Sequence, residues 1–515
     1  MAVVWIVTTG NSDVIMTSKD DWEDLRREKK LGQVYNQFEE SKLQENKDGE
    51  ICFSLPARAL GTLYEDKLDD EYWETLRFPL LKGFVAKLKA EGKQLSKIIM
   101  VLTNQDLIFD INKANSSSPC WQDTCKLESI FKHYFAQELN DIQIEPIYLR
   151  PKEGGKGLDD WDTTLQLVQE AFGKLEITAD EVFVSHQAGT PAISSAVQFV
   201  SLYKFGGKFK VSFLSSNERS EEVNLKEYSS YFQSMQMQEA KKLLENYNYV
   251  GVESVLKDRL KADDREAKNI LALLEVAKLW NLSKFDDDFK GKMESLDIED
   301  LGESATSRFN ESWAWWIAYE EAYLAVVRRK QGNIVEAFFH SFRAFEGIFA
   351  EWGKKTFNSY IDFNRDVPYL NADVLNDPQD YLSGSKLKDV RETIEKDGGI
   401  DLELMTLCKI FKVKRSDYKQ KCPDLITFWD NEREKRISAR RNFIFHQVQG
   451  IDEKQLLNFW QINSDQINSN QIKDWEDRIL RILDFIADKR KSKNWSEASL
   501  MARVHQELVK AIDDL

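Results

Sequence analysis

Short apolar runs alternate with helical patterns over roughly the first 220 residues of the chain. The runs are rich in β-branched residues and cover residues 3–7, 97–102, 142–149, 181–185 and 208–214. Continuous apolar runs of this length are typical of strands that are covered on both faces. Between them, the hydrophobic spacing predicts helices over residues 124–138, 161–172 and 192–204. Strands that alternate with helices predict a parallel, doubly wound sheet.

From about residue 227 onward, the strand pattern stops and helical spacing takes over. Helices predicted over residues 235–247 and 267–280 form a connector, residues 226–300, that is either a signal transmitter or a passive spacer. Residues 301–515 are predicted to be all-helical, with helices over residues 311–329, 333–353, 426–449, 471–491 and 496–514. Within them, residues 354–424 contain Pro, Asn, Asp and Gly and are predicted to be an irregular insertion. The expected fold class is α/β plus all-α, with the sheet domain over residues 1–225.

Size and charge narrow the possible functions. A chain of 515 residues and 60.0 kDa is too long for one hydrophobic core. Its formal net charge of −16 disfavours a surface that coats nucleic acid generally, so an RNA site must be a local basic patch. Such a patch stands at Arg433, Lys435, Arg436, Arg440 and Arg441.

Five scattered cysteines without a C-x-x-C pair disfavour both a disulfide framework and a zinc site, so no metal or other cofactor is predicted. The sequence shows neither a signal-peptide pattern nor an apolar segment of membrane-spanning length. We therefore expect a cytoplasmic protein without a membrane partner.

Small and polar residues follow three of the predicted strands, as TTGNSD after the first, TNQD after the second and HQAGTP after the fourth. In doubly wound sheets, ligands bind at the carboxyl ends of the strands. Gly189 allows a ligand to approach the backbone closely, and Pro191 suits the start of a helix whose free N–H groups attract an anion. Tight turns explain Gly10, Gly189 and Pro191 equally well. No G-x-G-x-x-G or Walker A pattern is present, so a dinucleotide coenzyme is not indicated.

A charged amphipathic helix is predicted within residues 431–450, NEREKRISARRNFIFHQVQG, and ends at a glycine. His446 can move a proton near neutral pH, and Arg441 can bind a phosphate through two hydrogen bonds. Asn442 shares a helix face with His446, whereas Arg441 lies about 140° from His446 around the axis. These residue types suit RNA cleavage. The spacing alone is also typical of a solvated helix whose histidine lies near the C-terminal end of the dipole.

This segment resembles the R-x4-6-H motif of the HEPN ribonucleases, which Arg441, Asn442 and His446 match one for one. Arg343 and Glu346, three residues apart on a predicted helix, resemble the charged helix that packs beside the motif helix in that family. An ordinary ion pair explains these two residues equally well.

The N-terminal loops carry a second resemblance. TTGNSD after the first strand, with GTPAISSA opening a later helix, resembles the two ligand loops of the CARF domain, a Rossmann-like sensor of type III CRISPR systems. A CARF-like sheet followed by a HEPN-like helical domain is the layout of the CRISPR-associated ancillary ribonucleases that cyclic oligoadenylate activates.

The combined resemblance implies a metal-independent endoribonuclease that cleaves single-stranded RNA in antiviral defence and leaves a 2′,3′-cyclic phosphate. His446 would transfer protons or hydrogen-bond the reacting groups, with Asn442 orienting its ring. Arg441, with Arg440, would stabilise charge on the phosphoryl oxygens. Two such helices across the axis of a homodimer, or of a higher oligomer, would share one cleft.

The resemblance also implies a pocket for the activator that two sheet domains share, with tetra-adenylate favoured over hexa-adenylate. The residues expected to bind the activator are Thr8, Thr9, Gly10, Asn11, Ser12, Asn104, Gln187, Gly189, Thr190 and Pro191. His186 and Ser12 make degradation of the activator conceivable, although a lone histidine at a strand end is more often structural. Two alternatives stay open: a catalytically inactive nucleotide-sensing adaptor or dimerisation protein, and a HEPN ribonuclease controlled by another nucleotide.

Overall fold

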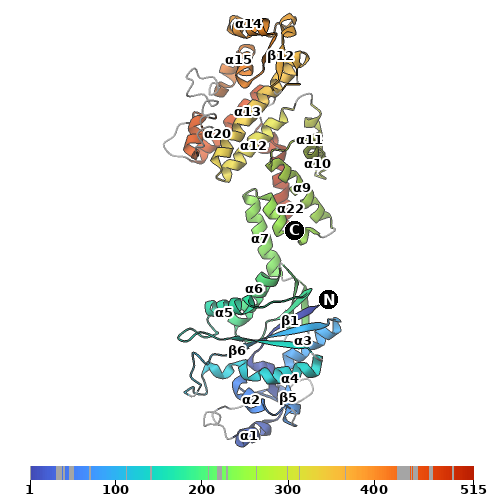
Figure 1. Ribbon diagram of the computed structural model, residues 1–515, viewed down its shortest axis with the longest axis vertical. Coiled ribbons are helices and arrows are strands. Elements are labelled where there is room, and N and C mark those ends of the chain that lie inside the picture. Colours follow the sequence, from blue (N-terminus) through green and yellow to red (C-terminus); the bar gives the residue numbers. More distant parts are fainter. Residues whose placement is uncertain are drawn as a thin grey trace. The chain divides into compact units, whose positions relative to one another are not determined.

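The computed structural model divides the chain into two compact units, Met1–Ser234 and Met235–Leu515 (Figure 1). The structure describes residues 2–29, 38, 41–45, 51–68, 71–111, 113–139, 142–206, 208–216, 223–227, 230–261, 264–298, 300–311, 314–362, 364–365, 367–425, 441, 444, 450–462, 468–489 and 492–515. The described hydrophobic clusters each lie within one unit, so each unit has a core of its own.

A six-stranded sheet in the order β10-β9-β8-β1-β6-β7 forms the centre of the first unit. The strands span β1 Val3–Thr8, β6 Leu95–Thr103, β7 Gln143–Leu149, β8 Glu181–Ser185, β9 Lys210–Ser216 and β10 Val223–Glu227. All described pairs are parallel except that of β9 with β10. The strands predicted from the apolar runs are confirmed. The edge strand β10, VNLKE, escapes prediction because its sequence is mostly polar.

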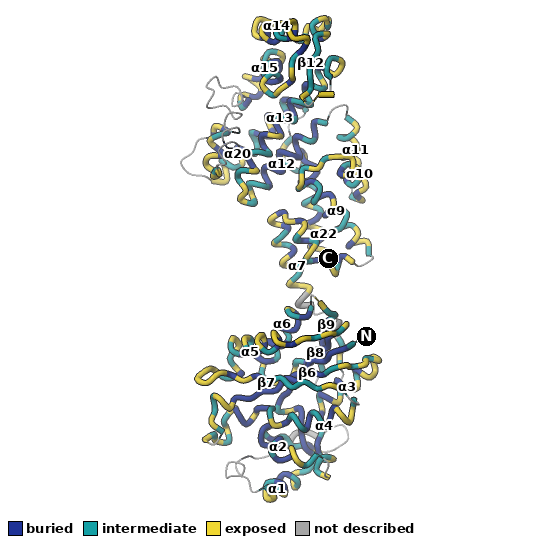
Figure 2. Tube along the Cα trace, viewed as in Figure 1, coloured by how far each residue is buried: buried dark blue, intermediate teal, exposed yellow. Residues whose placement is uncertain are grey.

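Helices cover both faces of this sheet. Alternate residues of a strand point to opposite faces. The odd-numbered residues of β1 pack with α2, α3 and α4, and its even-numbered residues pack with α5 and α6. The helices span α2 Ala57–Tyr64, α3 Pro79–Ala90, α4 Glu128–Leu139, α5 Trp161–Gly173 and α6 Pro191–Phe205. Burial on both sides, seen as the dark strands in Figure 2, explains the continuous apolar runs.

The segment between β1 and β6 contains elements that the hydrophobic pattern does not reveal. A second, antiparallel sheet has the order β3-β4-β2-β5. Its strands and the preceding helix span β2 Ile15–Met16, α1 Lys19–Glu28, β3 Ser41–Glu45, β4 Ile51–Ser54 and β5 Leu76–Arg77. The strands β2 and β5 are only two residues long, which is too short to produce a periodic signal.

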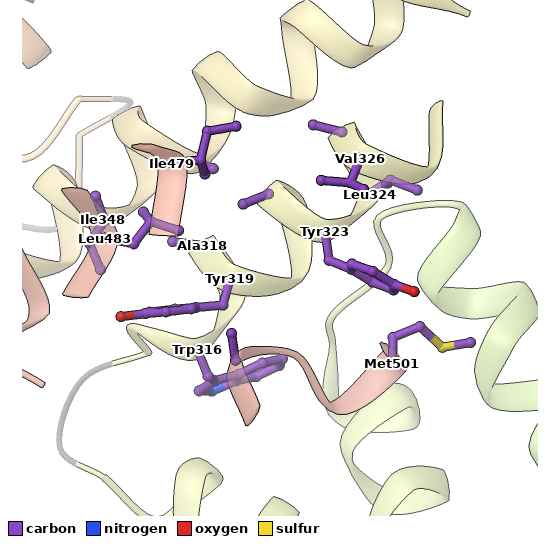
Figure 3. Packing of buried hydrophobic residues seen from close by; sticks show 14 of the residues in the cluster. Trp316, Ala318, Tyr319, Tyr323, Leu324, Val326, Ile348, Ile479, Leu483 and Met501 are labelled. Carbon is purple, nitrogen blue, oxygen red and sulfur yellow. The ribbon is translucent and has the colours of Figure 1, made fainter. Parts of the chain in front are cut away.

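The second unit is mainly helical and is built around α12. Nearly every residue of α12 from Trp316 to Val327 is buried, so α13, α20 and α22 pack around this helix. Figure 3 shows Tyr319 of α12 beside Ile348 of α13 and Leu483 of α20. The helices span α7 Ser230–Glu245, α8 Tyr249–Val255, α9 Arg265–Asn281, α10 Asp287–Glu294, α11 Leu301–Phe309, α12 Trp316–Lys330, α13 Ile334–Phe357, α19 Glu453–Phe459, α20 Ser469–Ala487, α21 Trp495–Ala498 and α22 Leu500–Asp513.

Two helix predictions need correction. The helix expected over residues 311–329 begins only at Trp316. The helix expected over residues 496–514 is broken at Ser499, whose side chain caps α22 by accepting a hydrogen bond from Ala502 N and donates one to the buried Glu320. Residues of the predicted connector pack into the same core as α12. The division at residues 225 and 300 stays a prediction.

The expectation of an irregular, strand-free insertion over residues 354–424 is wrong. This segment contains a three-stranded antiparallel sheet and three further α-helices in its described part. They span β11 Ile361–Asp362, β12 Tyr369–Asn371, α14 Lys388–Asp397, β13 Gly399–Asp401, α15 Leu404–Lys414 and α16 Tyr418–Lys421. The strands are only two or three residues long, which hides them from any pattern of period two.

Candidate functional site

The loops that follow β1, β6, β7 and β8 meet around a cavity of about 580 Å³. Parallel strands bring their carboxyl ends to the same edge of a sheet, so loops far apart in sequence become neighbours. The residues that line the cavity are Thr9, Gly10, Asn11, Ser12, Thr103, Gln105, Phe109, Pro119, Gln122, Asp123, Thr124, Gly157, Leu158, Asp159, Gln187, Ala188, Gly189, Thr190 and Ile193. The three loops singled out in the sequence therefore lie together.

Seven of the ten predicted activator-binding residues line this cavity: Thr9, Gly10, Asn11, Ser12, Gln187, Gly189 and Thr190. The other three, Thr8, Asn104 and Pro191, do not line the cavity. The Thr8 hydroxyl donates to the Ser185 carbonyl at 3.3 Å, and Asn104 Oδ1 accepts from Arg58 Nη2 at 2.8 Å. Pro191 is the first residue of α6.

Two glycines bring the β1 and β8 loops into direct contact. A Cβ atom on Gly10 would lie 2.8 Å from the backbone nitrogen of Gly189, closer than real Cβ atoms come. Gly189 itself has φ +95°, a conformation that side chains disfavour. A side chain at either position would therefore push apart the two loops that form one wall of the cavity.

The N-terminus of α6 forms another part of the wall. The Thr190 hydroxyl accepts a hydrogen bond from Ile193 N at 3.2 Å and caps the helix. The same hydroxyl donates to the Leu158 carbonyl at 2.7 Å, which ties the β7 loop to α6. A capped helix N-terminus at a cavity favours a negatively charged ligand such as a phosphate.

Below the cavity, Gln105 joins three segments. Its backbone nitrogen and its Nε2 both donate to the Asp123 carboxylate, at 2.8 and 3.1 Å, and its Oε1 accepts from Leu158 N at 2.9 Å. Asp123 is 1% exposed and forms an ion pair with Arg58 of α2 at 2.9 Å. A buried pair with further hydrogen bonds satisfies both charges and holds the floor of the cavity in one arrangement.

Sequence reasoning missed the residues of this floor. Gln105 stands inside the TNQD loop, and its position after a strand is the signal that could have selected it. Asp123 lies between two short 3-10 helices, Pro119–Gln122 and Thr124–Leu127, and Thr124 begins the second of them, so both reach the cavity only through the tertiary fold. Among the described residues that line the cavity there is no Lys or Arg, so its polar groups are amides, hydroxyls, carboxylates and backbone groups.

Two titratable groups lie close to these loops. Asp13 is buried, accepts a hydrogen bond from Gly10 N at 2.7 Å, and has its pKa raised to about 7 by burial. His186, the predicted candidate for activator degradation, does not line the cavity. Its Nδ1 lies 2.9 Å from the Ser194 hydroxyl, and burial lowers the pKa of its imidazole. A role of His186 in degrading the activator stays a prediction.

A second cluster of polar groups lies on α13 in the helical unit. Glu321 of α12 is 4% exposed and contacts His340 Nδ1 at 2.7 Å and Arg343 Nη2 at 3.1 Å. One turn further along α13, burial raises the pKa of Glu346, and the positive charges of Arg441 and Arg343 oppose that rise. The guanidinium carbon of Arg441 lies 5.7 Å from the centre of the Phe342 ring.

These contacts place Arg441 beside α13, the helix that contains Arg343 and Glu346. The described part of the motif segment is Arg441, Ile444 and Gly450, and Ile444 is buried in the helical core. The other predicted catalytic residues, Arg440, Asn442 and His446, lie outside the described residues. Their roles stay predictions.

Comparison with known proteins gives a fold but no close relative. No protein-family model matches the chain, and no curated protein matches its sequence. A solved structure of Enterococcus italicus Csm6 bound to cyclic hexa-2′-fluoro-hexa-dAMP matches 99% of this chain and 99% of its own, with a TM-score of 0.55 and 11% identity. The two chains share a fold. The predicted fold class, a parallel α/β sheet domain followed by a helical domain, is confirmed.

Two further observations concern the described residues alone. They contain no group of three or more His, Cys, Asp and Glu side chains arranged to hold a metal ion. None of their helices is both long and apolar enough to cross a membrane.

Proposed function

We propose that this chain is a CRISPR-associated endoribonuclease that cleaves single-stranded RNA and that cyclic oligoadenylate activates. The observation that carries the proposal is the cavity at the carboxyl edge of the sheet, in a chain whose fold matches that of a protein bound to a cyclic oligonucleotide. Its volume of about 580 Å³ lies within the range of about 300–1,000 Å³ for small-molecule sites.

The lining of the cavity supports a nucleotide ligand. The N-terminus of α6 attracts a phosphate, while the exposed hydroxyl of Ser12 and the exposed amide of Gln122 offer the hydrogen bonds that a base and a ribose require. If a cyclic ligand spans two copies of the sheet domain, the same cavity of each copy would bind one half of the ring. The proposal includes a cytoplasmic homodimer, with cyclic oligoadenylate as its activator.

Catalysis is assigned to the helical unit. The 2′-hydroxyl of RNA attacks the adjacent phosphorus, so the protein must move protons and stabilise negative charge. In the proposal His446, oriented by Asn442, serves the proton transfer, and Arg441 with Arg440 binds the phosphoryl oxygens. Support comes from Arg441, which lies beside Phe342 and close to Glu346. Binding of the activator in one unit would shift the other towards its competent state.

Cleavage of a fluorescent single-stranded RNA tests both halves of the proposal. The reaction is run with the wild type and with His446→Ala, each without activator and with cyclic tetra- or hexa-adenylate. Tetra-adenylate is the ring that the family resemblance favours, whereas the ring in the similar structure has six nucleotides. We expect cleavage only with one of the rings and a loss of at least a hundredfold in His446→Ala.

Each other result points to a different protein. Cleavage without an activator, or with another nucleotide only, would indicate a HEPN ribonuclease with different control. Activator binding without any cleavage would indicate a nucleotide-sensing adaptor. A His446→Ala variant as active as the wild type would show that the motif helix is ordinary structure.

A further inference from the structure

A basic stretch precedes the motif segment of the second unit. Residues 409–421 contain six Lys or Arg residues and one Asp, within a chain whose formal net charge is −16. The stretch covers the C-terminal half of α15 and all of α16. A local positive surface on so acidic a chain attracts a polyanion.

Acidic neighbours neutralise only part of this charge. Lys409 pairs with Asp389, Arg415 pairs with both Asp417 and Asp488, and Lys421 also pairs with Asp417. Lys414 and Lys419 are exposed, and no carboxylate among the described residues pairs with either of them.

Aromatic rings hold two of the cations in place. Lys414 donates to the main-chain carbonyl of Asp380 at 3.1 Å and lies over the ring of Tyr381. The guanidinium of Arg415 lies 4.3 Å from the centre of the Phe485 ring. Rings beneath the cations limit their freedom without cancelling their charge. The surface is therefore ordered before a polyanion arrives.

The packing of α15 on α13 shows where this surface leads (Figure 1). Leu407 contacts the position of a Cβ atom on Gly353, and Phe411, one turn later in α15, packs on Phe349, one turn earlier in α13. The two helices thus run antiparallel, and the basic end of α15 is directed towards the earlier turns of α13.

Those earlier turns contact Arg441. Phe342, Phe349 and Gly353 are separated by seven and four residues, so they lie within about 40° of one another on the same face of α13. Arg441 lies over Phe342, about 10 Å along the helix from Phe349. The C-terminal end of α15 and Arg441 therefore lie along the same face of α13, whereas the Lys414 side chain turns back to Tyr381, whose ring packs on Phe357 at the end of α13.

We propose that the exposed lysines of residues 409–421 bind the phosphate backbone of the single-stranded RNA substrate next to the site of cleavage. This inference rests on the proposed ribonuclease function. RNA is the polyanion that must reach Arg441, and lysines that bind phosphates contribute affinity without reading sequence. Substitutions here should therefore change the KM for RNA rather than kcat, and they should do so for any sequence.

The test is a triple variant, Lys414→Glu with Lys419→Glu and Lys421→Glu. Its matched control carries Lys242→Glu, Lys257→Glu and Lys261→Glu, which are exposed lysines of the same unit and change the net charge equally. We expect KM to rise at least tenfold in the triple variant, with kcat within about twofold. The slope of log kcat/KM against log salt concentration should fall by about 2, since each lost single-strand phosphate contact contributes about 0.7. The control should match the wild type.

A second measurement keeps the inference separate from the proposed function. The affinity for RNA is measured by fluorescence anisotropy in the His446→Ala background, with a matching Lys→Gln triple variant in case charge reversal disturbs folding. If the wild type cleaves no RNA with any ring, the proposed function fails, but a tenfold loss of RNA affinity in the triple variants would still uphold the RNA-binding surface. Equal KM and equal affinity in the variants and the control would overturn it.

Discussion

Single residues of the first unit shape the cavity in two ways. Gly10 and Gly189 permit a close loop contact because they lack side chains, whereas Gln105, Asp123 and Arg58 hold the floor through buried hydrogen bonds. Asp13 differs from both groups because its carboxyl has one hydrogen bond for two oxygens. Burial of such a group disfavours its ionised form.

The raised pKa of Asp13 predicts a pH dependence of stability. The folded state keeps this proton up to about pH 7, whereas the unfolded chain loses it near 3.8, so folded Asp13 holds more protons between these values. Its contribution to the free energy of unfolding therefore falls as pH rises from about 4 to 7 and stays low above it. In Asp13→Asn, whose side chain can still accept from Gly10 N, we expect a smaller loss of Tm between pH 5 and pH 8. Thermal unfolding followed by circular dichroism measures it, and an unchanged pH difference would contradict the assignment.

Glu346 is predicted to position Arg441. Its carboxylate is subject to the positive charges of Arg441 and Arg343, so Glu346→Gln removes an attraction that holds the Arg441 guanidinium. We expect kcat for RNA to fall about tenfold with little change in Tm, because the loss concerns orientation of a charge in the transition state. Glu336→Gln is the matched control, since Glu336 lies on the same helix and pairs with Arg328 at 2.9 Å. Equal rates in both variants would assign Glu346 a purely structural role.

At the scale of elements, α6 connects the cavity to the sheet. Its capping hydroxyl, Thr190, also holds the β7 loop through Leu158. The element α15 does the corresponding work in the helical unit, where it presents basic residues beside α13. In both helices, the proposed function depends on residues at the end of the helix rather than on its buried face.

Removing the cap of α6 should weaken activator binding. Thr190→Val loses the hydrogen bonds to Ile193 N and to Leu158, which costs about 1 kcal/mol of stability and frees the β7 loop. We expect the Kd for the activator, measured by calorimetry, to rise at least fivefold, while Thr190→Ser retains affinity.

A matched cap elsewhere provides the control. Ser18→Ala removes the corresponding cap of α1, which does not line the cavity, and should reduce stability by a similar amount without changing the Kd. A Kd that rises equally in Ser18→Ala would show that affinity follows overall stability rather than the cap.

At the scale of the whole molecule, the described hydrophobic cores divide between the two units. A polypeptide of residues 1–234 should consequently fold alone and bind the activator, and it should cleave no RNA. The activator should raise the Tm of this fragment, since a ligand that binds only the folded state stabilises it. Calorimetry and circular dichroism measure both effects, and an unfolded fragment would show that the units depend on one another.

The sequence by itself determined the fold class and most of the main elements. Strands buried on both faces must be apolar throughout, so the central strands were visible without coordinates, as were the helices with a regular apolar stripe. The loops after three of these strands were also visible, and seven of the ten candidate residues in them line the cavity. The local hydrophobic pattern is enough to predict an element wherever its residues are buried in a regular pattern along the whole element.

Only the tertiary structure decided which further residues meet those loops. Asp123 and Leu158 reach the cavity from segments without any periodic signal, because their positions depend on long-range hydrogen bonds such as those of Gln105. The three-stranded sheet of β11, β12 and β13 stayed hidden for a related reason, since its strands are two or three residues long and gain their hydrogen bonds only from one another. Pairing between segments that are distant in the sequence does not change the local spacing of hydrophobic residues, so only the tertiary structure shows this pairing.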